Sequence, residues 1–267
     1  MQPKRAPSGP DMTGFTRSNH DINGVTTVVH SIGSGPVIVF LHGTGTFTGF
    51  EMARAWAARH TVIIPYHPGF GDSDDAPALT TIDDYVLHYL DLFDQLALGT
   101  FDLAGFSLGG WLAAEIAIRQ PQRVRRLALV APAGLVVDAA PAPGLLDITP
   151  PELPGYLAYD PAAALRYFPT APDEAFDARL GREVMGYAKL VRDNPQGNPK
   201  LAHWLHRLTM PTLVLWGAND RLRPTAQGKA WIAGLPRGEL ALVPNTGHLV
   251  FEETPAAAGR VTDFLAT

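Results

Sequence analysis

The chain has 267 residues, a net charge of −5, a pI near 6.0 and no cysteine. The absence of cysteine excludes disulfide bonds and thiolate metal sites, and an acidic balance without a basic stripe argues against a nucleic-acid partner. No apolar run is long enough for a membrane-spanning helix, and we expect no membrane partner. Residues 1–14 are rich in proline, glycine and polar side chains and lack the apolar stretch of a secretory signal. We therefore expect a flexible tail at 1–14 on a cytoplasmic protein, whose oligomeric state the sequence does not indicate.

Short apolar or alternating segments predict the β-strands of the chain. They lie at residues 15–22, 25–30, 37–41, 61–64, 100–104, 127–130, 212–216 and 239–244. Asn23-Gly24 separates the first two and is typical of a tight hairpin turn. Helical patterns separate most of the others, and one of them is capped by Thr81 and presents an apolar face as far as Leu98. Strands separated by helices predict an α/β fold with a mainly parallel, doubly wound sheet of about eight strands.

The rhythm of strands and helices breaks between Ala133 and Leu208. Prolines crowd the first half of this region, and helical patterns follow at Glu174–Arg192 and Lys200–Leu208. We expect a core built from residues 15–132 and 209–267, with residues 133–208 inserted as a helical cap over the strand ends. Such a cap can exclude water and select substrates, whereas the alternative is a surface excursion with no role in binding.

Gly105-Phe106-Ser107-Leu108-Gly109 carries the strongest chemical signal. It fits the pattern G-x-S-x-G, follows a buried strand and precedes a helix. A serine on such a tight strand-to-helix turn exposes its hydroxyl at the top of a sheet, and the flanking glycines leave room for the turn. We identify Ser107 as a nucleophile.

A serine nucleophile needs a base to take its proton and a carboxylate to orient that base. Asp220 follows the strand at 212–216, and His248 follows the strand at 239–244. Both lie past the carboxyl ends of strands, where open α/β sheets build their sites. We assign His248 as general base and then acid, and Asp220 as its orienting carboxylate. Asp138, beyond the strand at 127–130, is the alternative acid.

Acyl transfer also needs hydrogen-bond donors for the developing oxyanion. We expect the backbone N–H of Leu108 to be one donor, since that residue follows the nucleophile. The second donor should come from the loop His42-Gly43-Thr44-Gly45-Thr46, with Thr44 preferred and Gly43 next. We interpret His42 as a residue that supports this loop through a hydrogen bond.

The chain resembles the α/β-hydrolase superfamily over nearly its whole length. Beyond Ser107, Asp220 and His248, the resemblance rests on His42-Gly43, the loop His67–Ser73, and Gly247-His248 followed by Glu252-Glu253. These motifs resemble the capped branch of esterases, C–C-bond hydrolases and lactone hydrolases. The resemblance implies hydrolysis of a small carboxylic ester through an acyl-serine intermediate, without a cofactor. Relatives on this scaffold that use an aspartate nucleophile are disfavoured by Ser107.

The substrate pocket should combine residues beside the nucleophile and the histidine, Phe106 and Leu249, with aromatic or flexible side chains of the insertion. The latter candidates are Tyr156, Tyr159, Tyr167, Phe168, Met185, Tyr187 and Trp204. The insertion also carries Arg166, Arg179, Arg182 and Arg192. An inward-facing arginine would suit a C–C-bond hydrolase acting on dienoic keto acids, but acidic neighbours at helical spacing favour solvated ion pairs. A neutral small-molecule ester is therefore the first expectation.

Other chemistries share this scaffold. A cyanohydrin lyase, a cofactor-free perhydrolase or a ligand receptor could retain the same three residues. Turnover would reject a receptor, a trapped acyl-enzyme would disfavour the lyase, and the peracid yield in hydrogen peroxide would test for the perhydrolase. No histidine spacing typical of a metal site is present, and His203 and His206 look like residues of a helix surface.

Overall fold

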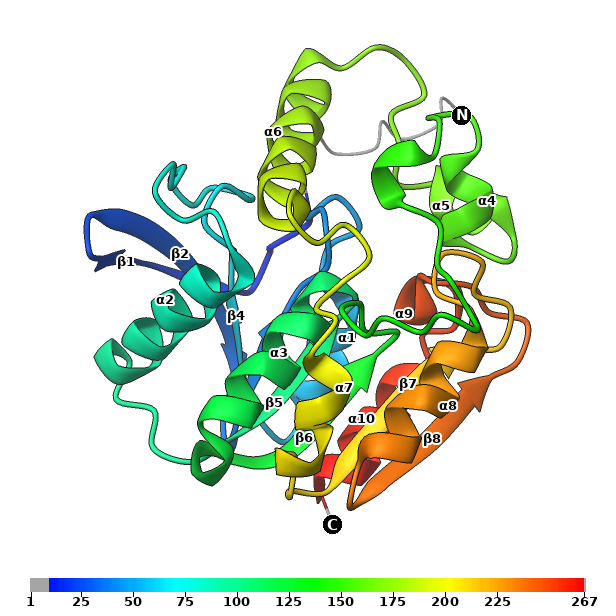
Figure 1. Ribbon diagram of the computed structural model, residues 1–267. Coiled ribbons are helices and arrows are strands. Elements are labelled where there is room, and N and C mark those ends of the chain that lie inside the picture. The colour runs from blue at the N-terminus through cyan, green and yellow to red at the C-terminus, as the bar shows by residue number, and fades with distance from the viewer. Residues whose placement is uncertain (1–9, 267) are drawn as a thin grey trace.

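The computed structural model describes residues 10–266, which form one mixed sheet between layers of helices (Figure 1). The sheet has eight strands in the order β1-β2-β4-β3-β5-β6-β7-β8. β1 pairs antiparallel with β2 and β2 with β4, and every later pairing is parallel. The predicted α/β architecture is confirmed. The strands are β1 (Thr16–Ile22), β2 (Val25–Gly33), β3 (Val37–Leu41), β4 (Thr61–Pro65), β5 (Phe101–Phe106), β6 (Val124–Val130), β7 (Thr212–Gly217) and β8 (Gly238–Val243).

Helices cover both faces of the sheet and lie above its carboxyl edge (Figure 1). They are α1 (Glu51–Trp56), α2 (Ile82–Gln95), α3 (Leu108–Arg119), α4 (Leu153–Leu157), α5 (Pro161–Leu165), α6 (Glu174–Val191), α7 (Leu201–Trp204), α8 (Thr225–Gly234), α9 (Val250–Glu253) and α10 (Ala257–Ala266). Short 3₁₀ helices occupy Pro121–Arg123, Leu145–Asp147 and Leu205–Arg207. Within residues 10–266, no helix has both the length and the apolar character needed to cross a membrane.

Local chemistry accounts for several of these boundaries. Asn23 and Gly24 both have positive φ, 52° and 85°, which is the backbone geometry of a two-residue hairpin turn between β1 and β2. Thr81 begins α2 with a capping box, in which its hydroxyl accepts from the N–H of Asp84 and the Asp84 carboxylate accepts from the N–H of Thr81. Both features follow directly from the sequence.

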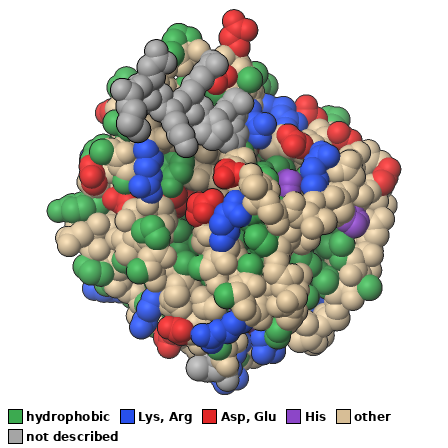
Figure 2. Space-filling view, turned by 180° about the vertical axis from the view of Figure 1, so that it is seen from behind, with side chains coloured by type: hydrophobic (Ala, Val, Ile, Leu, Met, Phe, Trp, Pro, Cys, Tyr) green, Lys and Arg blue, Asp and Glu red, His purple; other side chains and the backbone are tan. Residues whose placement is uncertain are grey.

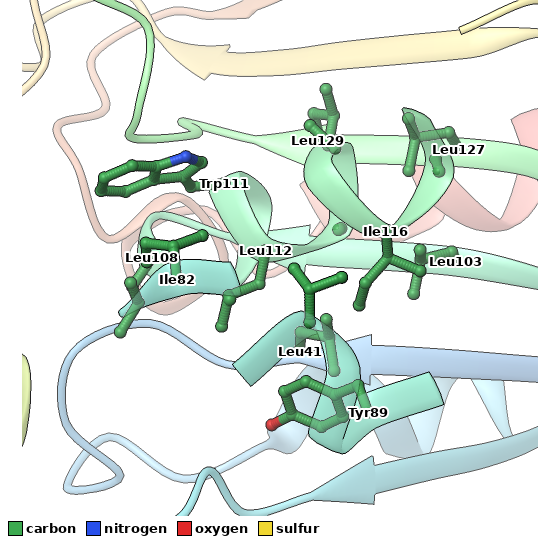
Figure 3. Close-up of a cluster of buried hydrophobic side chains, with 14 of the residues drawn as sticks. Leu41, Ile82, Tyr89, Leu103, Leu108, Trp111, Leu112, Ile116, Leu127 and Leu129 are labelled. Atoms are coloured by element: carbon green, nitrogen blue, oxygen red, sulfur yellow. The ribbon is translucent and has the colours of Figure 1, made fainter. Parts of the chain in front are cut away.

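Alternate side chains of the central strands enter two separate cores. In β3, Val39 and Leu41 face the core under α2, α3 and α8, whereas Ile38 and Phe40 face the core under α1 and α10. This period of two is expected for strands buried on both faces. Figure 3 shows the first core, where Leu108, Leu112 and Ile116 of α3 pack against residues of the strands and of α2.

The N-terminal segment differs from the predicted tail. Residues 1–9 of that tail lie outside the described residues, but residues 11–13 are held against α1. The Arg54 guanidinium donates to the carbonyl oxygens of Thr13 and Asp11 at 2.7 and 3.2 Å. Met12 packs against the core under α1 and α10. Arg54 also forms an ion pair with Glu51. On the face of the molecule seen from behind, basic and acidic side chains are interspersed (Figure 2).

A helical insertion, residues 136–197, leaves the core after β6 and returns before α7. Its two ends meet at a bridge between Leu135 and Asn198, where the N–H of Asn198 donates to the carbonyl oxygen of Gly134 at 2.8 Å. The insertion carries α4, α5 and α6, which lie above the carboxyl ends of the strands (Figure 1). In the last part of the predicted range 133–208, after this bridge, Leu201 and Leu205 are buried in the core with Trp231 of α8.

Candidate active site

Ser107 stands on a strained turn between β5 and α3. Its φ of 52° and ψ of −114° lie outside the regions that L-residues favour. The turn is held by its own backbone, since the Ser107 N–H donates to Val130 and its carbonyl oxygen accepts from Ala133. The flanking glycines are sterically required: a Cβ at Gly105 would lie 2.3 Å from the carbonyl oxygen of Gly109.

Ser107, His248 and Asp220 form a continuous hydrogen-bonded chain. The distance from Ser107 Oγ to His248 Nε2 is 3.0 Å, and that from His248 Nδ1 to Asp220 Oδ2 is 2.8 Å. The ionised carboxylate can only accept, so Nδ1 carries the ring proton and Nε2 is free to accept from the serine hydroxyl. All three residues are buried, and Asp138, the alternative acid, is an exposed residue of the insertion.

Glycines also bring the loops of Asp220 and His248 together. A Cβ at Gly217, the last residue of β7, would lie 1.9 Å from the carbonyl oxygen of Gly247. The second carboxylate oxygen of Asp220 accepts the N–H of Arg223 at 2.7 Å, which fixes its rotation. The loops after β7 and β8 therefore approach each other more closely than any residue other than glycine at position 217 would allow.

His42 supports the loop after β3, as predicted. Its Nε2 accepts the N–H of His67 at 3.1 Å, and its Nδ1 donates to the carbonyl oxygen of Gly43 at 2.8 Å. Burial lowers the pKa of His42 to about 4, so the imidazole is neutral at neutral pH. The Gly43 carbonyl and the Thr44 N–H belong to the same planar peptide unit, so this hydrogen bond also restrains the Thr44 N–H.

The N–H groups of Leu108 and Thr44 are the expected donors to an oxyanion. Leu108 is the first residue of α3, and its N–H has no intrahelical acceptor because the first turn of a helix leaves such groups unpaired. Thr44 lines the same cavity as Ser107 and His248. Gly43, the second choice, lies against the Phe106 ring, where a Cβ would meet Cδ1 at 2.8 Å.

A cavity of about 780 Å³ opens above Ser107 and His248. Its walls come from the loop after β3, the insertion and the loops after β7 and β8. The apolar lining residues include Phe47, Phe106, Leu145, Leu157, Phe168, Phe176, Leu180, Val184, Tyr187, Leu222 and Leu249. Of the residues expected to form the pocket, Phe106, Phe168, Tyr187 and Leu249 belong to this lining.

Five predicted pocket residues do not belong to this lining, namely Tyr156, Tyr159, Tyr167, Met185 and Trp204. The Arg221 guanidinium covers the Tyr156 ring at 4.8 Å, so this ring packs on the loop after β7. Tyr159 is 53% exposed, because its segment contacts the core through its backbone and leaves the side chain in solvent. Trp204 lies on α7 beside His203 and His206, in the part of the chain that belongs to the core.

The insertion is fixed to the core by two glutamates whose roles the sequence did not reveal. Glu253 of α9 accepts the N–H groups of Tyr159 and Asp160 from the insertion at 3.1 and 2.9 Å, and also that of Gly247 beside His248. Glu183 of α6 accepts from Thr46 and Gly71 of the core. Acidic residues on helices carry no local sign of such partners, which lie up to 137 positions away in the sequence.

One sequence signal for the cavity wall was available. Phe176, Leu180, Val184 and Tyr187 of α6 recur at helical spacing and line the cavity together. The charged residues of the lining are Asp173 and Asp177, and no lysine or arginine belongs to the lining within the described part of the chain. The four arginines of the insertion face other partners: Arg166 donates to Tyr167 and Glu252, Arg179 faces Asp72, Arg182 bonds Ser73 and Asp75, and Arg192 pairs with Asp193.

The sheet order, the strained serine turn and the order serine, aspartate, histidine define an α/β-hydrolase. The model of the alpha/beta hydrolase family matches residues 38–259. The chain belongs to this family and is an enzyme of the serine hydrolase type.

Named relatives and a solved structure agree with this class. The chain is 30% identical to the 2-hydroxymuconate semialdehyde hydrolase of Pseudomonas sp. strain CF600, over 91% of each chain. It is 28% identical to the pimeloyl-[acyl-carrier protein] methyl ester esterase of Nitrosomonas europaea, over 85% of this chain and 94% of that one. The structure is similar in fold to a meta-cleavage product hydrolase from Pseudomonas fluorescens IP01, with a TM-score of 0.76, 23% identity and coverage of 93% and 97%.

Proposed function

We propose that the protein is a serine esterase that cleaves an uncharged carboxylic ester with an apolar acyl group. Ser107 Oγ attacks the ester carbonyl while His248 Nε2 takes its proton, and Asp220 stabilises the imidazolium that results. The N–H groups of Thr44 and Leu108 stabilise the oxyanion. His248 then protonates the leaving alcohol, and a water molecule, activated by the same histidine, releases the acid from the acyl-serine.

The observation that supports this proposal is the position of the hydrogen-bonded chain at the base of an apolar cavity. The cavity offers aliphatic and aromatic walls to an acyl chain, and its acidic lining residues, Asp173 and Asp177, would repel an anionic one. At about 780 Å³ the cavity exceeds the needs of an acetyl group and falls in the range of ordinary ligand pockets, about 300–1,000 Å³. The insertion, which supplies much of the wall, would serve as the cap.

The test is the hydrolysis of p-nitrophenyl acetate, butyrate and octanoate by the wild type and by Ser107→Ala. We expect KM to fall with chain length by at most about fourfold per methylene, because each buried methylene contributes roughly 0.8 kcal/mol. A fluorophosphonate should label the wild type at Ser107 and leave a folded Ser107→Ala untouched. Equal turnover by wild type and mutant would overturn the proposal.

A C–C-bond hydrolase is the second candidate, and the 30% identity to a 2-hydroxymuconate semialdehyde hydrolase favours it. Its substrate class carries a carboxylate, for which the described cavity lining offers no basic side chain. The comparison to make is kcat/KM for that semialdehyde against p-nitrophenyl butyrate. A higher value for the semialdehyde would favour the C–C-bond hydrolase, and turnover of either substrate would exclude a pure ligand receptor.

A further inference from the structure

Glu183 is a buried carboxylate outside the chain of Ser107, His248 and Asp220. It lies in the middle of α6 and is only 1% exposed. Its Oε1 accepts the Thr46 hydroxyl at 2.7 Å and the Gly71 N–H at 2.9 Å, and its Oε2 accepts the Thr46 N–H at 2.9 Å. Among the described residues no ion pair includes Glu183.

Such a carboxylate is expensive to bury, because a charge removed from water must be compensated by its surroundings. Three donors compensate it here, and all three come from two loops of the core. The neighbouring Arg182 does not neutralise it, since that guanidinium bonds Asp75 and the carbonyl oxygens of Gly71 and Ser73. Glu183 is therefore directed at the loops, and its strongest contacts are with Thr46.

Thr46 is two residues from Thr44 in the loop after β3. Between them Gly45 has φ +108°, a conformation that a residue with a side chain rarely adopts. A loop with glycines at positions 43 and 45 has little stiffness of its own. It is held on one side by His42, which bonds the Gly43 carbonyl oxygen, and on the other by Glu183, which bonds Thr46. The Thr44 N–H lies between these two fixed points.

We propose that Glu183 is a positioning residue of the oxyanion hole, supplied to the core by the insertion. Its carboxylate sets the position of the Thr44 N–H, so that the seating of α6 and the stabilisation of the oxyanion depend on each other. This inference rests on the proposed serine esterase function. It assigns the insertion a part in transition-state stabilisation in addition to its part in forming the cavity.

The test compares Glu183→Gln and Glu183→Ala with Glu174→Gln, an exposed glutamate in the first turn of the same helix. We expect the Glu183 variants to lose about 10- to 100-fold in kcat per active site, with KM changed far less, because a small displacement of a catalytic donor costs up to about 10²-fold. Active sites are counted from the burst of p-nitrophenol. The affinity for an alkylboronic acid, which forms a tetrahedral adduct with serine, should fall by a similar factor.

A merely structural role gives a different result. Glu183 variants with a lower Tm but a wild-type kcat per counted site, and an unchanged boronate affinity, would overturn the proposal. If these variants do not fold, Thr46→Val removes the hydroxyl contact alone, and parallel losses in kcat and boronate affinity are again expected. Unchanged values for Thr46→Val would then overturn it. Failure of the esterase proposal itself is separate, because wild type and Ser107→Ala would then hydrolyse the esters equally.

Discussion

The strand-end loops that carry Ser107, Asp220 and His248 differ from the insertion in how they are held in place. The loops are fixed by backbone sterics, with glycines at Gly105 and Gly217 where chains touch. The insertion is held across long sequence separations, both by apolar side chains of α6 such as Leu190 and Val191 that are buried in the core and by Glu183 and Glu253, which accept backbone N–H groups across its boundary. The positions of Ser107, Asp220 and His248 thus depend on local constraints of the core, whereas the cavity wall and the proposed position of the Thr44 N–H depend on contacts between distant parts of the chain.

Asp220→Asn should give the largest effect on the core side of this comparison. The amide would favour the wrong imidazole tautomer, and we expect kcat to fall by about 10³–10⁴ with the fold intact. Asp138→Asn is the matched control, because Asp138 is exposed in the insertion. A full loss in Asp138→Asn with an active Asp220→Asn would show that the acid is misassigned.

Gly217→Ala should disturb the contact between the loops after β7 and β8. The new methyl would lie 1.9 Å from the Gly247 carbonyl oxygen, so His248 must shift relative to Ser107. We expect a loss of about 10² in kcat, since misplacement of about 1 Å has this cost. Gly99→Ala has no atom within 4 Å of its added methyl and serves as control. Equal kinetics for the two variants would contradict the steric argument.

Acid should destabilise the core through its buried histidines, none of which lies between residues 136 and 197 of the insertion. Burial lowers the pKa of His88 to about 4 in the folded protein, against about 6.5 when unfolded. The unfolded state therefore binds the proton first, and stability is lost as the pH falls from about 6.5 toward 4. At pH 5 this residue alone accounts for about 30-fold in the unfolding constant, or about 2 kcal/mol.

Urea unfolding at pH 7 and pH 5 measures this dependence. His88→Gln, which keeps a polar partner for the Thr27 hydroxyl, should lose less stability than the wild type over that interval. An identical pH dependence in both proteins would remove His88 from the explanation. The activity of folded protein at pH 7 should be unchanged, because His88 lies outside the cavity lining.

Leu180→Trp should give the smallest effect and should act on selectivity alone. Leu180 lines the cavity, so the larger ring would take the place of part of the acyl chain. Loss of room for about two methylenes should reduce the preference for octanoate over acetate by about tenfold. Met185→Trp is the matched control on the same helix, because Met185 is 74% exposed and does not line the cavity. The same shift in both variants would contradict the assigned wall.

The sequence by itself determined what local sterics and periodicity decide. The turn at Ser107 needs Gly105 and Gly109 close to it in the chain, and the hairpin turn needs Asn23-Gly24. Strands that are buried on both faces can be predicted because they are apolar runs in the sequence. His248 and Asp220 could be placed because each follows such a run and the carboxyl ends of parallel strands meet at one edge.

Only the tertiary structure decided which residues meet across long separations. Glu183 and Thr46 are 137 positions apart, and nothing local marks either as the partner of the other. The insertion returns at Asn198, where it forms a bridge with Leu135 ahead of α7, and Trp204 therefore lies on the surface of α7 outside the cavity lining. The cavity wall was decided in the same way, because a side chain lines a pocket only when the packing of its whole element turns it inward.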